Sequence, residues 1–72
     1  MANYIEITFP VTDTELQQVL IAQLSEEGFE GFEENETELK AFIPEADYAI
    51  EKVQLIADAQ QVAFSATLIE SQ

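Results

Sequence analysis

The chain has 72 residues, of which 15 are Asp or Glu and two are Lys or Arg, so its formal net charge is −13 at pH 7. Such a charge repels nucleic acids and anionic membranes and attracts cationic partners. His, Cys and Trp are absent. Without an imidazole or a thiol, the chain lacks common catalytic bases and nucleophiles and the soft metal ligands. The composition therefore favours an acidic recognition module over an enzyme.

The length predicts a single small domain over residues 1–72. Apolar residues make up 47% of the chain, which is too many for a disordered acidic tail. No apolar run reaches the length of a signal-peptide core or a membrane span. We therefore expect a folded cytoplasmic domain.

The first strand and helix are predicted from residues 3–28. Side chains alternate from Tyr4 to Phe9 with the period of a half-buried strand, and a proline follows. Residues 12–15 have the spacing of a capping box, with Thr12 as the cap, and apolar residues then recur at helical spacing. Gly28 is expected to end the helix in a left-handed conformation, with Phe29 packing back in a Schellman ending.

Two further strands are predicted at residues 29–34 and 36–43, joined near Asn35. A bulge at Gly31 would bring Phe29 and Phe32 to the same face. Asp47 is a plausible cap for a second helix, which carries an apolar stripe from Ala49 to Ala57. Residues 62–69 alternate again and predict a fourth strand.

The order strand, helix, strand, strand, helix, strand predicts a ferredoxin-like α+β sandwich. Right-handed crossovers would place both helices on one face of a four-stranded antiparallel sheet, with the first and third strands central. The expected core consists of apolar residues from five of the six elements: Ile5, Ile7, Phe9, Leu16, Val19, Leu20, Leu24, Leu39, Ala41, Ile43, Ile50, Val53, Ile56, Val62, Phe64 and Leu68.

The other face of this sheet would be open to solvent or to a partner. We expect it to present, as partner-binding candidates, Tyr4, Glu6, Thr8, Lys40 and Phe42, beside Ala63, Ser65 and Thr67 of the last strand. In RNA-binding domains of this topology, aromatic rings on this face stack on bases while basic residues hold the phosphates. The charge here is reversed, which argues against nucleic acid. The Tyr4 and Phe42 rings are either a protein-binding anchor or an incidental exposed pair.

Seven glutamates crowd the middle third of the chain: Glu26, Glu27, Glu30, Glu33, Glu34, Glu36 and Glu38. They could form a patch for a basic protein surface or a weak cation site, or they could simply keep the domain soluble. The pattern of a calcium-binding loop is absent, and no glycine-rich phosphate loop opens a helix. We assign no catalytic, cofactor-binding or metal-binding residue.

Three segments, NYIEITF, LIAQLSEEGFEGFEE and LKAFIPE, resemble the N-terminal domain of the ribosomal protein L-eleven methyltransferase family. This resemblance implies a ferredoxin-like domain that recognises a basic ribosomal protein of the large subunit. A separate Rossmann-like domain of the parent protein would bind S-adenosylmethionine and transfer the methyl group. The glycine-rich cofactor loop has no counterpart here, so the fragment alone is expected to be inactive and to bind no cofactor.

Two other function classes fit the same fold. One is a regulatory module that binds a small molecule such as an amino acid, although the polar, glycine-containing loop expected after the first strand is missing. The other is a structural domain that oligomerises through its open face or an edge strand.

Overall fold

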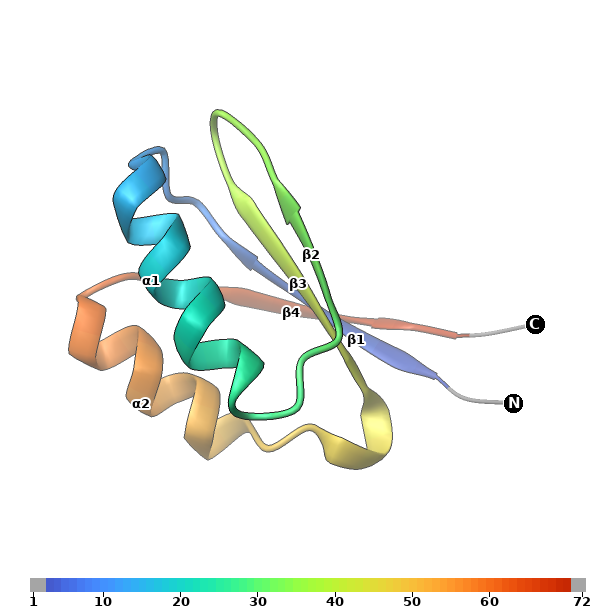
Figure 1. Ribbon diagram of the computed structural model, residues 1–72. Helices are drawn as coiled ribbons and strands as arrows, with labels where there is room; N and C mark the ends of the chain where they lie inside the picture. The colour runs from blue at the N-terminus through green and yellow to red at the C-terminus, as the bar shows by residue number, and fades with distance from the viewer. Residues whose placement is uncertain (1–2, 71–72) are drawn as a thin grey trace.

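The computed structural model describes residues 3–70 and shows the predicted order of elements. Four strands form one antiparallel sheet in the order β2-β3-β1-β4: β1 (Tyr4–Phe9), β2 (Gly31–Glu34), β3 (Leu39–Pro44) and β4 (Ser65–Ile69). Helices α1 (Thr14–Ser25) and α2 (Ile50–Gln60) lie on one side of the sheet, and a 3-10 turn, η1 (Glu45–Asp47), precedes α2 (Figure 1). The ferredoxin-like α+β sandwich is therefore confirmed. The predicted domain limits, 1 and 72, lie outside the described residues.

The two central strands produce the core because their side chains alternate between the two faces. In β1 and β3 every second residue is buried against the helices, and the register joins Ile7 to Ala41 directly. The ring of Phe9 also lies 6.0 Å from that of Phe64, between ring centres. The hydrophobic residues that are fully or almost fully buried are Ile5, Ile7, Phe9, Val11, Leu20, Leu24, Phe29, Leu39, Ala41, Ile43, Val53 and Ala57.

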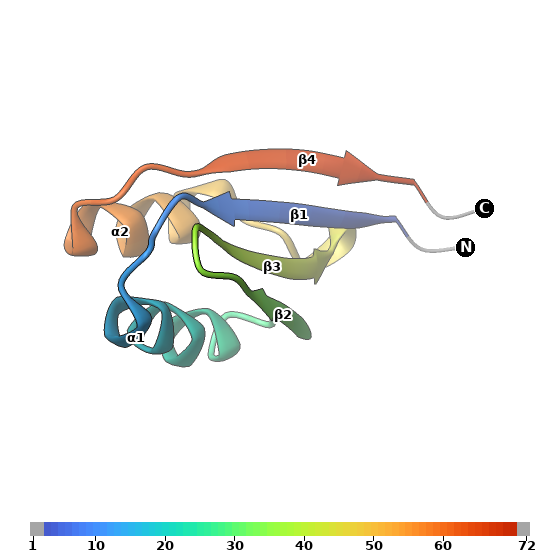
Figure 2. The ribbon, with the colours of Figure 1, turned by 90° about the horizontal axis from the view of Figure 1, so that it is seen from above.

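Three residues of the predicted core are exposed instead: Val19, Ile50 and Leu68. Val19 lies about 100° around α1 from the buried Leu20 and so points away from the sheet. Ile50 is the first residue of α2, and Leu68 lies on the edge strand β4. Figure 2 shows the end of β4 and the beginning of β1 extending past the helices, so the helical layer does not cover this end of the sheet.

Four other predicted core residues, Leu16, Ile56, Val62 and Phe64, are only partly buried and pack against the core. Conversely, the predicted core omitted Val11, Phe29 and Ala57, which are buried. Val11 and Phe29 lie in connections, where no periodicity points to burial.

The end of α1 has the predicted Schellman geometry. The backbone N–H of Phe29 donates to the carbonyl of Leu24, and that of Gly28 donates to Ser25, each at 3.4 Å. Gly28 has φ +98°, the positive value that this ending requires. The motif turns the chain back onto the sheet, and both Phe29 and Leu24 are buried.

The beginnings of both helices differ from the predictions. The α1 cap is Asp13 rather than Thr12, because the Asp13 carboxylate accepts from the backbone N–H groups of Glu15 and Leu16. An ionised carboxylate is a stronger acceptor there than a hydroxyl. Asp47 does not cap α2: it belongs to η1, and α2 begins after Ala49 without a side-chain cap.

The predicted pairing of Phe29 with Phe32 is confirmed, since the two rings stack with their centres 6.5 Å apart. The cause differs from the prediction. Phe29 lies before β2, in the connection from α1, and β2 pairs with β3 in continuous register from Gly31 to Glu34.

A buried polar residue of α1 joins two connections of the fold. Gln17, only 3% exposed, lies on the buried side of α1. Its side-chain amide donates to the carbonyl of Val11 at 2.6 Å and to that of Asn35 at 2.9 Å. These bonds fix the segment before α1 and the β2–β3 turn to the same helix.

We predict that Gly28→Ala lowers the free energy of unfolding by about 1–2 kcal/mol, because a Cβ is strained at a positive φ. The matched control is Gly31→Ala, where a Cβ would meet the Phe42 side chain at an ordinary 3.7 Å. Urea unfolding measures both. Equal losses in the two variants would contradict the left-handed role of Gly28.

We predict that Gln17→Ala costs about 1–3 kcal/mol of unfolding free energy, because two carbonyl groups lose their donor, and that of Val11 is buried. The control is Gln18→Ala, since the exposed Gln18 donates to the Glu34 carboxylate at the surface. That change should stay within about 0.5 kcal/mol. Urea unfolding measures both variants. If Gln17→Ala left the free energy of unfolding unchanged, the two hydrogen bonds of Gln17 would not contribute to stability.

Candidate partner-binding surface

The five predicted partner-binding residues lie together on the sheet face that the helices leave uncovered. Tyr4, Glu6 and Thr8 are the half-buried residues of β1, between its buried ones. The register places Glu6 opposite Phe42 and Thr8 opposite Lys40 on β3. We call this surface the open face; it occupies the centre of the sheet.

The two aromatic residues of the open face are diagonal neighbours. Tyr4 pairs with Pro44 and Phe42 with Glu6, two residue pairs further along the same ladder. Diagonal neighbours lie about 7–8 Å apart, within reach of aromatic side chains. The Phe42 ring also covers Gly31 of β2, at a distance of 3.7 Å from the position that a Cβ there would take. Part of this ring therefore packs on the edge of the sheet, and part faces outward.

A hydrogen bond outside the predicted set orients Tyr4. Its hydroxyl donates to the Glu30 carboxylate at 3.2 Å, across 26 positions of the chain. This bond, followed by the negative charge of Glu30 and by burial, raises the pKa of Tyr4 above its ordinary value of 10.0. Glu30 lies in a connection without periodicity, and only the folded chain brings it to the ring.

The glutamates of the middle third do not form one patch. Glu30 and Glu33 border the open face, where Glu33 pairs with Lys40 in the β2–β3 register. The Lys40 ammonium lies 3.6 Å from the Glu38 carboxylate. The others lie elsewhere: Glu34 contacts α1 through Gln18, Glu36 lies in the β2–β3 turn, and Glu26 and Glu27 follow α1. The open face therefore has an aromatic centre and an acidic border.

Strand β4 extends the open face on its other side. Ser65 and Thr67 pair with Thr8 and Glu6, so they share this face as predicted. Ile69 pairs with Tyr4 and lies there too, 40% exposed. Its position follows from the same alternation that places Thr67. The predicted Ala63 lies in the connection before β4.

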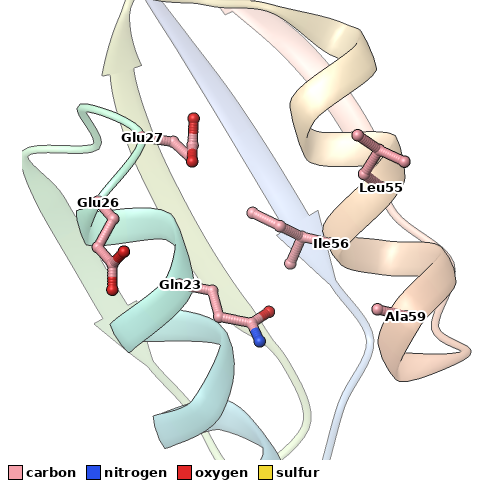
Figure 3. Close-up of a pocket in the computed structure, with 6 residues that line it drawn as sticks. All are labelled: Gln23, Glu26, Glu27, Leu55, Ile56 and Ala59. Atoms are coloured by element: carbon pink, nitrogen blue, oxygen red, sulfur yellow. The ribbon is translucent and has the colours of Figure 1, made fainter.

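A shallow groove lies on the opposite side of the molecule, between the two helices (Figure 3). It has a volume of about 260 Å³ and is lined by Gln23, Glu26, Glu27, Leu55, Ile56 and Ala59. The Lys52 ammonium of α2 reaches Glu27 at 3.3 Å and joins the two sides. Pockets for drug-sized ligands span about 300–1,000 Å³, so this groove is small for such a ligand.

Within residues 3–70, no group of three or more acidic side chains is placed to hold a metal ion. In the same range, neither helix has the length and apolar character needed to cross a membrane. The open face combines two half-buried aromatic rings with charged side chains. These features define a ferredoxin-like domain with an open, acid-bordered sheet face.

Comparison with known proteins gives a more particular result. The chain is 41% identical over 54 residues to a ribosomal protein L11 (L-eleven) methyltransferase of Chlorobaculum parvum. The match covers 75% of this chain but 18% of that relative. It supports the family resemblance noted in the sequence. No protein-family profile matches the chain. No solved structure matches it either.

We predict that Glu30→Gln lowers the pKa of Tyr4 toward 10.0, because the hydrogen bond and the charge that raise it weaken. The neutral phenol is the form that this contact favours. Its contribution to stability is therefore complete below the unfolded pKa and is lost as the pH rises through the raised pKa. Phenolate absorbance in an alkaline titration measures the shift.

Glu33→Gln is the control, because Glu33 also borders the open face but makes no hydrogen bond to Tyr4. Tyr48, whose pKa burial raises, should titrate alike in all three proteins. If the titration curves of Glu30→Gln and the unmutated domain coincided, the hydrogen bond between Tyr4 and Glu30 would not be formed in solution.

Proposed function

We propose that this chain is the substrate-recognition domain of a ribosomal protein methyltransferase and that its open face holds a basic ribosomal protein of the large subunit. The observation that carries the proposal is the 41% identity to a ribosomal protein L11 methyltransferase over three quarters of the chain. The relative's name gives a ribosomal protein as its substrate. Because this chain spans 18% of that relative, the activity of the whole protein is part of the proposal.

The charge of the domain supports a cationic partner. At −13, the surface attracts basic proteins over a distance of several ångströms and repels the phosphates of ribosomal RNA. The domain would therefore select the protein component of its target. The carboxylates need not touch the partner to contribute to this steering.

The open face supplies the contacts that steering alone does not provide. Interface anchors are often aromatic, lie near the centre of the contact and are surrounded by polar groups that exclude water. Tyr4 and Phe42 have this placement, with Glu6, Glu30 and Glu33 around them. Glu6 and Glu33 would pair with Lys or Arg of the ribosomal protein while the rings cover its apolar surface.

The chemistry of methyl transfer would belong to another domain of the parent protein. That domain would bind S-adenosylmethionine and carry the catalytic groups, while the present chain positions the substrate. Holding a substrate in a reactive geometry raises the rate even when the holding residues do no chemistry.

The test is calorimetric titration of the domain with ribosomal protein L11 at low and moderate salt. We expect binding that weakens as salt rises, because ions screen the attraction. Phe42→Ala should weaken binding by roughly tenfold or more, corresponding to about 1.4 kcal/mol. Its effect on stability should stay below the roughly 3–5 kcal/mol of a fully buried Phe, since Phe42 is half-buried.

Leu55→Ala is the matched control, because Leu55 is 70% exposed and lies on the helical side of the molecule. It should bind like the parent domain. If the unmutated domain did not bind at either salt concentration, the recognition role would be overturned. Equal losses from the two variants would instead remove the open face as the contact surface.

A further inference from the structure

The outer edge of β4 is one of the two strand edges that the described fold leaves without a partner strand. β4 pairs with β1 on one side, and Figure 2 shows no other segment beyond it. All five of its residues are exposed, with Leu68 at 47% and Ile69 at 40%. No charged residue occurs from position 59 to position 69, in a chain of net charge −13.

Soluble proteins usually protect such edges with charges, proline or a bulge, because an open row of backbone groups pairs with other strands. The opposite edge of this sheet follows that rule: β2 is four residues long and ends in Glu33 and Glu34. β4 has none of these devices between Ser65 and Ile69, and its register with β1 is uninterrupted. The absence of protection indicates that this edge is used.

The backbone groups that face outward can be identified from the register. The N–H of Glu45 donates to the carbonyl of Asn3, so Asn3 directs its backbone groups toward the β3 side. Because direction alternates along an antiparallel strand, Tyr4, Glu6 and Thr8 bond to β4. Their partners Ile69, Thr67 and Ser65 are thus occupied. Ala66 and Leu68 present their N–H and C=O groups at the free edge.

We propose that β4 pairs antiparallel with β4 of a second copy of this chain, centred on Thr67. In this register Ala66 of each copy lies opposite Leu68 of the other, and these residues exchange hydrogen bonds through the groups that face outward. The two Thr67 residues form the central pair without backbone bonds, where side chains approach most closely. A two-fold axis relates the two copies, so the outward backbone groups of both β4 strands are paired in one contact.

The side chains are complementary in this register. On the helical side, the large Leu68 meets the small Ala66, and on the open face Ile69 meets Ser65. The central Thr67 pair is among the favourable cross-strand pairs. No carboxylate opposes another along the five residues, since Ser65–Ile69 is uncharged. The contact thus lies on the part of an acidic domain where self-repulsion is lowest.

The absence of charge also argues for a second copy over a basic partner at this edge. A cationic segment would gain nothing from the charge of β4 itself, whereas the open face carries carboxylates. The pairing would join two sheets into one of eight strands and place both open faces on the same side. The inference goes beyond the proposed function and does not depend on it, and the two respond to salt in opposite directions.

Cross-linking tests the register, because the chain contains no Cys. Thr67→Cys places two thiols opposite each other, within the span of a disulfide. Ser65→Cys is the matched control: both residues pair with β1 on the open face, but two Cys at position 65 would lie about 13 Å apart along the strands. In a glutathione redox buffer we expect Thr67→Cys to give disulfide dimers several-fold faster. Equal rates would overturn the register.

Sedimentation tests the association itself. We expect the mass to rise from 8.1 kDa toward twice that value as protein concentration increases, and the rise to strengthen with salt as repulsion is screened. Ala66→Pro removes a backbone N–H that faces the free edge and makes no bond to β1. This variant should stay monomeric. A monomer at every concentration and salt, or a folded Ala66→Pro variant that still associates, would overturn the proposal. The Cys comparison decides the matter if Ala66→Pro fails to fold.

Discussion

The register between β1 and β3 is the constraint on which the rest of the molecule depends. It places Ile5, Ile7 and their partners on the side of the helices and Glu6 and Phe42 on the other. A slip by one residue would exchange the faces and bury Glu6 in the core. Because a buried, unpaired carboxylate is costly, the charge pattern enforces the same register as the apolar pattern. Core and open face are two results of one alternation.

The helical layer is held to this sheet by features at its ends as well as by its apolar stripe. Gly28 reverses the chain so that Phe29 joins the core, and Gln17 links α1 to the segment before it and to the β2–β3 turn. Both act where the chain leaves a regular element. A domain this small has a thin core, so such links matter more than in a larger protein.

The distribution of charge separates the two proposed contact surfaces. Carboxylates border the open face, where they would favour the proposed basic partner, and they are absent from β4, where like charges would oppose a second copy. Ile69 belongs to both surfaces, since it lies on the open face and on the edge strand.

The sequence by itself determined the order of elements, the central position of β1 and β3 and the faces of their side chains. These depend on period-two and helical spacing, which are local properties. It also indicated the Schellman ending, because a positive φ selects Gly. Only the tertiary structure decided that Val19, Ile50 and Leu68 are exposed, since coverage depends on where the helices lie over the sheet. The contact of Glu30 with Tyr4 was likewise decided by folding, because it joins residues 26 positions apart through a connection that has no period.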